Sequence, residues 1–173
     1  MVTINASTTA GLVMTSDLSG VLTFQQGGVS LPNGGVAPAF SAYYTGGGQT
    51  IASYTFVKII ANTKEFDTNS NFDSTTNYRF TPTVAGYYQV NGQISFTTTI
   101  VGAQVAIFKN GAQFKNGNNP TSTSWATVSA LIYLNGSTDY IELYVAQTSG
   151  VSATTAATST QNNYFQACLV RGA

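Results

Sequence analysis

Apolar and polar side chains alternate along residues 86–96, and this period of two constrains the fold more than any other feature of the chain. One phase carries the apolar side chains Tyr88, Val90, Ile94 and Phe96. The other phase carries the polar side chains Gln89, Asn91, Gln93 and Ser95. A strand with one buried face has this period, because successive side chains point to opposite sides of a sheet. Segments 128–134, 141–145 and 165–169 repeat it, so the sequence predicts a protein built of β-strands.

Two Asn-Gly pairs lie between such segments. Asn110-Gly111 separates 105–109 from 112–115, and Asn135-Gly136 separates 128–134 from 140–145. Asn-Gly tolerates the positive φ angles of a type I′ turn, so each pair predicts a hairpin. No segment favours a helix. We therefore expect an all-β fold: an antiparallel jelly-roll sandwich of about ten strands, preceded by a short β arm.

Residues 1–36 form the predicted arm, and residues 37–173 form the predicted jelly-roll domain. Strand candidates at 12–15 and 21–25 flank the turn-forming residues 17–20. Two short strands cannot bury a core of their own, so we expect the arm to pack against its own domain, other copies or a larger assembly. The residues predicted to make this attachment are the arm's apolar ones, Leu12, Val13, Leu22 and Phe24.

The charge composition excludes several kinds of partner. Charged residues make up only 7% of the chain, and six basic side chains balance six acidic ones. Nothing in this balance favours nucleic acid or an anionic membrane surface. No apolar segment approaches the ~20 residues that a membrane helix needs. Residues 1–11 lack the basic and apolar regions of a signal peptide, so we expect a protein made in a cytoplasm.

The sequence lacks the residues and motifs that common catalytic sites use. The chain has no histidine, which removes Ser-His-Asp and Cys-His arrangements, histidine-bound metals and the commonest general base. Gly46-Gly47-Gly48 lacks the following Lys-Ser/Thr of a phosphate-binding loop. Cys168 is the only cysteine, and we expect it to be a small buried side chain in a strand. The sequence predicts a protein that is not an enzyme and uses no cofactor.

One segment has a pattern suited to a metal ion. Oxygen-bearing side chains alternate at Asp67, Asn69, Asn71 and Asp73, as in the calcium loop of an EF-hand. The glycine and bidentate glutamate positions of that loop are Phe72 and Tyr78. These four residues are therefore weak candidates, and the pattern favours a polar loop whose side chains cap their own turns. No metal is predicted.

A family resemblance emerges from segments in a fixed order. Residues Phe80–Tyr88, Phe-Thr-Pro-Thr-Val-Ala-Gly-Tyr-Tyr, resemble the signature of the complement C-one-q globular head. Further segments that resemble this family are, in chain order, 39–42, 72–73, 105–111, 129–145 and 164–169. The resemblance covers residues 37–172. It departs from the family at Thr138, where a glycine is usual, and in having no collagen repeat ahead of the domain.

This resemblance implies a ten-strand jelly roll of the tumour-necrosis-factor type and a homotrimer. Ten Tyr and ten Phe exceed what one small core needs, and aromatics on an outer strand face indicate a covered surface. The residues predicted to form the threefold interface are Tyr88, Tyr144 and Tyr164. The alternative is that these are scattered surface tyrosines, which are common.

The arm resembles a different group of proteins. Thr8–Leu22, Thr-Thr-Ala-Gly-Leu-Val-Met-Thr-Ser-Asp-Leu-Ser-Gly-Val-Leu, is similar to segments of phage tail-fibre and other virion proteins. This resemblance implies a location in the virion, with the arm binding other virion proteins and the jelly roll facing outward.

Two polar segments could bind a ligand, namely 116–124 and 148–163. Amides hydrogen-bond to sugar hydroxyls and aromatic faces stack on sugar rings, so the ligand-binding candidates for a host surface glycan are Asn118, Asn119 and Trp125. The alternative for Trp125 is a place in the core.

Three functions fit the sequence. The first is a trimeric bacteriophage structural protein of the capsid-decoration or head-fibre type. The second is the receptor-binding tip of a tail fibre that recognises host glycan. The third is a cellular C-one-q-like ligand or adhesin.

Overall fold

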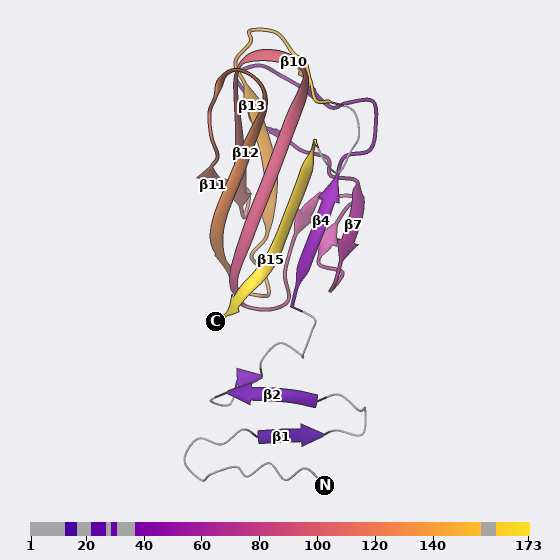
Figure 1. Ribbon diagram of the computed structural model, residues 1–173, viewed down its shortest axis with the longest axis vertical. Helices are drawn as coiled ribbons and strands as arrows, with labels where there is room; N and C mark the ends of the chain where they lie inside the picture. The colour runs from indigo at the N-terminus through magenta and orange to yellow at the C-terminus, as the bar shows by residue number, and fades with distance from the viewer. Residues whose placement is uncertain (1–12, 17–21, 27–28, 31–36, 157–161) are drawn as a thin grey trace.

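The computed structural model describes residues 13–16, 22–26, 29–30, 37–156 and 162–173 (Figure 1). In the arm, β1 (Val13–Ser16), β2 (Leu22–Gln26) and β3 (Val29–Ser30) pair in that order as an antiparallel sheet. Met14 is opposite Phe24, and Ser16 is opposite Leu22. Of the predicted attachment residues, Leu12 lies outside the described residues.

The body consists of two antiparallel sheets that share one long strand, β10 (Gly86–Lys109). In the first sheet, the first half of β10 lies between β12 and β15, β15 pairs with β4, and β4 pairs with β7. The bounds of these strands are β4 (Ala39–Tyr43), β7 (Thr63–Asp67), β12 (Thr121–Leu134) and β15 (Tyr164–Gly172).

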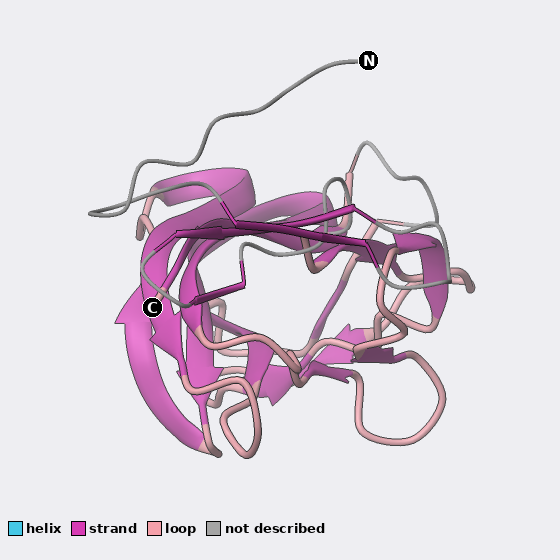
Figure 2. Cartoon of the chain, turned by 90° about the horizontal axis from the view of Figure 1, so that it is seen from below, coloured by secondary structure: helices cyan, strands magenta, loops and turns pink. Residues whose placement is uncertain are grey.

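In the second sheet, the second half of β10 pairs with β11 and β13, and β13 pairs with β6 and β9. The bounds are β6 (Val57–Lys58), β8 (Phe72–Asp73), β9 (Arg79–Phe80), β11 (Ala112–Asn116) and β13 (Ile141–Gln147). Two short strands, β5 (Thr50–Ile51) and β14 (Ala153–Thr154), pair separately. The predicted all-β antiparallel jelly roll is confirmed, and Figure 2 shows its two layers end-on.

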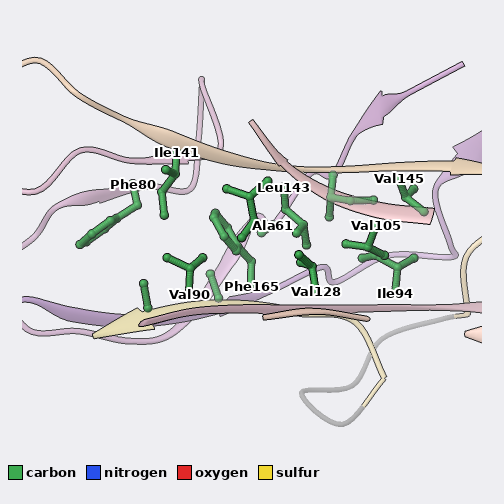
Figure 3. Close-up of a cluster of buried hydrophobic side chains, with 14 of the residues drawn as sticks. Ala61, Phe80, Val90, Ile94, Val105, Val128, Ile141, Leu143, Val145 and Phe165 are labelled. Atoms are coloured by element: carbon green, nitrogen blue, oxygen red, sulfur yellow. The ribbon is translucent and has the colours of Figure 1, made fainter. Parts of the chain in front are cut away.

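The core lies between the two sheets. Figure 3 shows Val90, Ile94 and Phe165 of the first sheet pointing toward Leu143 and Val145 of the second. These are inward-phase residues of alternating strands, as the sequence predicts. Toward one end the core is aromatic: the ring of Phe40 stacks on those of Phe72 and Phe80, each with a centroid distance of 4.6 Å.

The two Asn-Gly pairs have different roles. Asn110 and Gly111 both have positive φ, 53° and 79°, and join β10 to β11 in the predicted hairpin. The hairpin predicted at Asn135-Gly136 is wrong, because β12 and β13 belong to different sheets. The Oδ1 atom of Asn135 accepts hydrogen bonds from the main-chain N–H groups of residues 137, 138 and 139. This capped loop carries the chain from one layer to the other.

The body has two ends. We call the base the end at which Pro38 enters beside Leu169 and the last residue, Ala173, bonds to Ala85. The apex is the opposite end, where β10 crosses between the sheets at residues 96–102 and β13 ends (Figure 1). Among the described residues, the structure has no helix with the length and apolar character needed to span a membrane.

Candidate functional site: the outer face of the first sheet

The outer face of the first sheet exposes an unusual number of large apolar side chains. In an antiparallel sheet with one solvated face, this phase of each strand is normally polar. The exposed apolar residues on this face are Phe66, Tyr87, Trp125, Leu131, Tyr133 and Val170. Exposed apolar patches rimmed by polar groups mark sites of association, so this face is the candidate functional site.

Four of these residues gather at the base. Tyr87 of β10 lies directly opposite Tyr133 of β12, and their ring centroids are 5.5 Å apart. Beside them, Leu131 is 54% exposed and Val170 is 61% exposed. Tyr87, Leu131 and Val170 also line a shallow hollow, together with residues 171–173. We call Tyr87, Leu131, Tyr133 and Val170 the assembly patch.

Polar side chains border the assembly patch toward the middle of the sheet. The amide of Gln89 donates to the Ser129 hydroxyl at 2.9 Å and to the Asn91 side chain at 3.2 Å. Cys168 lies on the same face and is exposed. The expectation that Cys168 is buried is wrong, because it occupies the outward phase of β15, between the inward-facing Ala167 and Leu169.

Tyr88 does not belong to this surface. Its side chain is fully buried, and its hydroxyl donates a hydrogen bond of 2.7 Å to the main-chain oxygen of Val84. Burial raises the pKa of Tyr88. The prediction of Tyr88 as an interface residue is wrong because Tyr88 is in the inward phase of β10, and Tyr87 is the residue that faces outward.

Tyr144 and Tyr164 lie on different sheets. Tyr164 is half-buried on the first sheet, opposite Tyr43. Tyr144 is on the second sheet, where its ring stacks on Phe108 at 3.9 Å, and Phe108 contacts Phe56 edge-on at 5.5 Å. The three predicted tyrosines therefore do not form one surface, and of the three only Tyr164 is on the face that carries the assembly patch.

An ion pair accompanies the Tyr144 cluster. The ammonium of Lys58 donates to the buried carboxylate of Glu142 at 2.6 Å. Burial acts to lower the pKa of Lys58, but the hydrogen bond and the negative charge of Glu142 outweigh it, so the pKa is raised. The rings of Phe56, Phe108 and Tyr144 in this cluster are each half-buried.

The residues of the assembly patch share a sequence pattern, which is their position on the outward-facing side of alternating strands. Tyr87, Leu131 and Tyr133 fall in the phase that is opposite to the buried Tyr88, Ile132 and Leu134. The predicted interface missed all three. Large apolar residues in the nominally polar phase of an alternating strand are the signal that could have identified them.

The weak metal candidates form capped turns. Asp67 accepts the main-chain N–H groups of Asn71 and Phe72, each at 3.0 Å. Asp73 accepts those of residues 75, 76 and 77, and the bonds from Thr76 and Thr75 contribute most to a lowered pKa of its carboxyl. The Asn71 amide donates to the main-chain oxygen of Asn69. This geometry matches the turn-capping alternative, and the described residues contain no cluster of three His, Cys, Asp or Glu side chains suited to a metal.

The ligand-binding candidates differ in their exposure and contacts. Trp125 is 59% exposed, which excludes the alternative that it is a core residue. The Asn118 side chain accepts the N–H of Thr127 at 2.7 Å, so its role is to fix the loop that follows β11. Asn119 is exposed at the apex, with its side-chain oxygen near Gly102.

Comparison with known proteins identifies the fold through structure. No family model and no curated protein matches the chain. Vertex protein P5 of PRD1 superimposes with a TM-score of 0.61 at 18% identity, over 79% of this chain and 99% of that one. Eiger TNF from S. frugiperda gives 0.60 at 11% identity, over 80% and 94%. Murine APRIL gives 0.58 at 7% identity, over 77% and 98%. The chain therefore has the jelly-roll fold of the tumour-necrosis-factor type, as its resemblance to the C-one-q and tumour-necrosis-factor domains predicted.

Proposed function

We propose that the chain is the protomer of a homotrimeric, non-enzymatic structural protein of a bacteriophage particle. The observation that carries this proposal is the apolar outer face of the first sheet. A side chain such as Leu131, 54% exposed on a strand, gains about 25 cal/mol for each Å² of apolar surface that a neighbouring copy covers. Four such side chains side by side favour association over a free monomer.

Two further observations support the proposed trimer and the proposed virion location. The chain has a jelly roll of the tumour-necrosis-factor type. Its resemblance to domains of this type implies a homotrimer. The same fold occurs in vertex protein P5 of the phage PRD1, and the superposition covers 99% of that chain. Within the particle we propose the capsid-decoration or head-fibre type, with residues 1–36 binding other virion proteins through Leu12, Val13, Leu22 and Phe24.

The mass in solution tests the assembly. Light scattering after size-exclusion chromatography should give three times the protomer mass of 18.1 kDa. A monomer or a dimer at micromolar concentration contradicts the trimer. Immunogold electron microscopy of purified particles tests the location: label on the head or its fibres is expected, and particles without label contradict a virion protein.

A second candidate function is the receptor-binding tip of a tail fibre that recognises host surface glycan. The exposure of Trp125 and Asn119 favours it, because amide groups and open aromatic faces suit sugar binding. In this case the same trimer would be found at a fibre tip, and the microscopy would place the label there.

A further inference from the structure

The apex of the jelly roll is formed by segments without charge. Residues 44–55, 96–102, 117–124 and 148–156 contain no Asp, Glu, Lys or Arg. They are rich instead in Thr, Ser, Asn and Gly. The charged side chains of the body all occur in other segments.

Main-chain hydrogen bonds join these segments to one another. Thr148 donates to the main-chain oxygen of Gly102 at 3.1 Å, and Ala103 donates to that of Pro120 at 3.4 Å. On the other side of β13, Tyr54 donates to the main-chain oxygen of Gln147 at 2.8 Å. The apex is thus a single surface assembled from loops that are far apart in the sequence.

A buried amide fixes the shape of this surface. Gln147 is fully buried, and its Nε2 atom donates to the main-chain oxygens of Ile51 at 3.1 Å and Val151 at 2.7 Å. Its Oε1 atom accepts the N–H of Ser149 at 2.7 Å. A buried polar group with all of these partners holds both loops in one geometry, so the apex is ordered before any ligand arrives.

These loops project an aromatic ring into solvent. Tyr54 is 73% exposed and has a φ of 62°, a conformation that is unusual for a bulky residue. The Ser53 hydroxyl beside it accepts the N–H of Gly150 at 2.9 Å, which anchors the strained segment to the neighbouring turn. Strained residues persist where the surroundings hold them, and they concentrate at functional sites.

A shallow and mostly apolar hollow lies at the same end. Its lining residues are Thr99, Ile100, Val101, Thr121 and Ser122. Thr99, Thr121 and Ser122 contribute three hydroxyl-bearing side chains to this lining. The main-chain N–H of Val101 donates a hydrogen bond of 3.4 Å to the Ser149 hydroxyl. Hydroxyls both donate and accept hydrogen bonds, which is the pairing that a polyhydroxylated ligand requires.

We propose that the apex binds an uncharged carbohydrate. Tyr54 stacks on the apolar face of one sugar ring, and the hydroxyls of Thr99, Thr121 and Ser122 bond to sugar hydroxyls in the hollow. The absence of charge from the apex segments fits a neutral ligand and offers nothing to a polyanion. This goes beyond the proposed assembly, since no residue of the assembly patch lies in the apex segments.

The test measures binding of the full chain to a panel of neutral oligosaccharides of hexoses and N-acetylhexosamines, beside sulfated and sialylated controls, by biolayer interferometry. We expect at least one neutral oligosaccharide to bind. Tyr54→Asn removes the ring but tolerates positive φ, so it should weaken this binding by about tenfold or more. Tyr54→Phe keeps the ring and should bind like the parent chain.

Two further variants test whether the hollow takes part and whether an exposed ring elsewhere would bind equally well. Ser122→Gly removes one hydroxyl from the hollow, accepts the φ of 51° at this position, and should also weaken binding. Phe114→Asn removes an exposed ring from β11, outside the apex segments, and should not change binding. Because no charge takes part, affinity should stay constant between about 0.05 and 0.5 M salt.

Three results would overturn the proposal: no neutral oligosaccharide binds, only the anionic ones bind, or binding survives both Tyr54→Asn and Ser122→Gly. The mass in solution is measured on the same samples. A trimer that does not bind sugar overturns the apex site alone, and a monomer that binds sugar overturns the proposed assembly alone.

Discussion

Tyr87 and Tyr133 are paired directly across β10 and β12, their ring centroids are 5.5 Å apart, and each remains 43% exposed. Two tyrosines in contact on the solvent side of a sheet cover each other only in part. Leu131 and Val170 extend the same surface. The base of the first sheet is therefore the surface at which we propose that copies of the chain meet.

Leu131→Arg should therefore convert the proposed trimer into a monomer. The substitution places a charge in the centre of the assembly patch, where a covered and unpaired charge costs several kcal/mol. Light scattering at matched protomer concentration measures the effect. Phe114→Arg is the control, because Phe114 is similarly exposed but lies on β11 of the second sheet. A trimer that survives Leu131→Arg would show that the copies meet elsewhere.

Gln147→Leu should destabilise the body by about 2 to 4 kcal/mol, because the main-chain groups of Ile51, Val151 and Ser149 lose their hydrogen-bond partner, which is the buried amide of Gln147. Urea unfolding followed by circular dichroism at fixed protomer concentration measures the change. Gln113→Leu, at an exposed position, should change the stability by less than about 0.5 kcal/mol. Equal unfolding midpoints for both variants would contradict the structural role of Gln147.

Gly136→Ala should cost about 1 to 3 kcal/mol, because the residue has a φ of 70° and an added Cβ would lie within 2.3 Å of the main-chain nitrogen of Ala85. The matched control is Gly47→Ala, since a Cβ at Gly47 meets nothing within 4 Å. Thermal unfolding compares the two variants. If Gly47→Ala proves the more harmful, the crossing loop between β12 and β13 is not held as the structure shows.

Asp139 should make stability depend on pH in the acid range. The hydrogen bond from Lys109, with a separation of 2.8 Å between the charged atoms, lowers the pKa of this carboxyl against the opposing effect of its partial burial. A lowered pKa stabilises the folded state fully above the unfolded value of about 3.9, and the contribution is lost as the pH falls through the lower folded value.

Asp139→Asn therefore should lower the melting temperature near neutral pH, and its difference from the parent chain should shrink as the pH falls below about 4. Melting temperatures measured by circular dichroism over a pH series give this difference. Glu65→Gln, which removes a carboxylate from an exposed position of β7, serves as the control. A difference that stays constant down to pH of about 2 would show that the Lys109 pair does not contribute.

The local sequence pattern was sufficient to predict the strands and one turn. The alternation through Val90 and Ile94 identified the buried phase of β10, and Asn110-Gly111 identified the hairpin to β11. The same alternation places Tyr88 inside, whereas the abundance of aromatic residues favoured an interface role for it. The interface prediction failed because a count of aromatics carries no information on strand phase.

The sequence by itself determined that the chain is all-β and which side of its clearly alternating strands is buried. Only the tertiary structure decided that β12 and β13 lie in different sheets, that Tyr87 and Tyr133 meet, and that Gln147 joins two apex loops. The physical reason is that alternation fixes the inward phase of a strand through nearest neighbours along the chain. The choice of pairing partner depends on contacts between segments far apart in sequence, and those contacts create both the assembly patch and the apex.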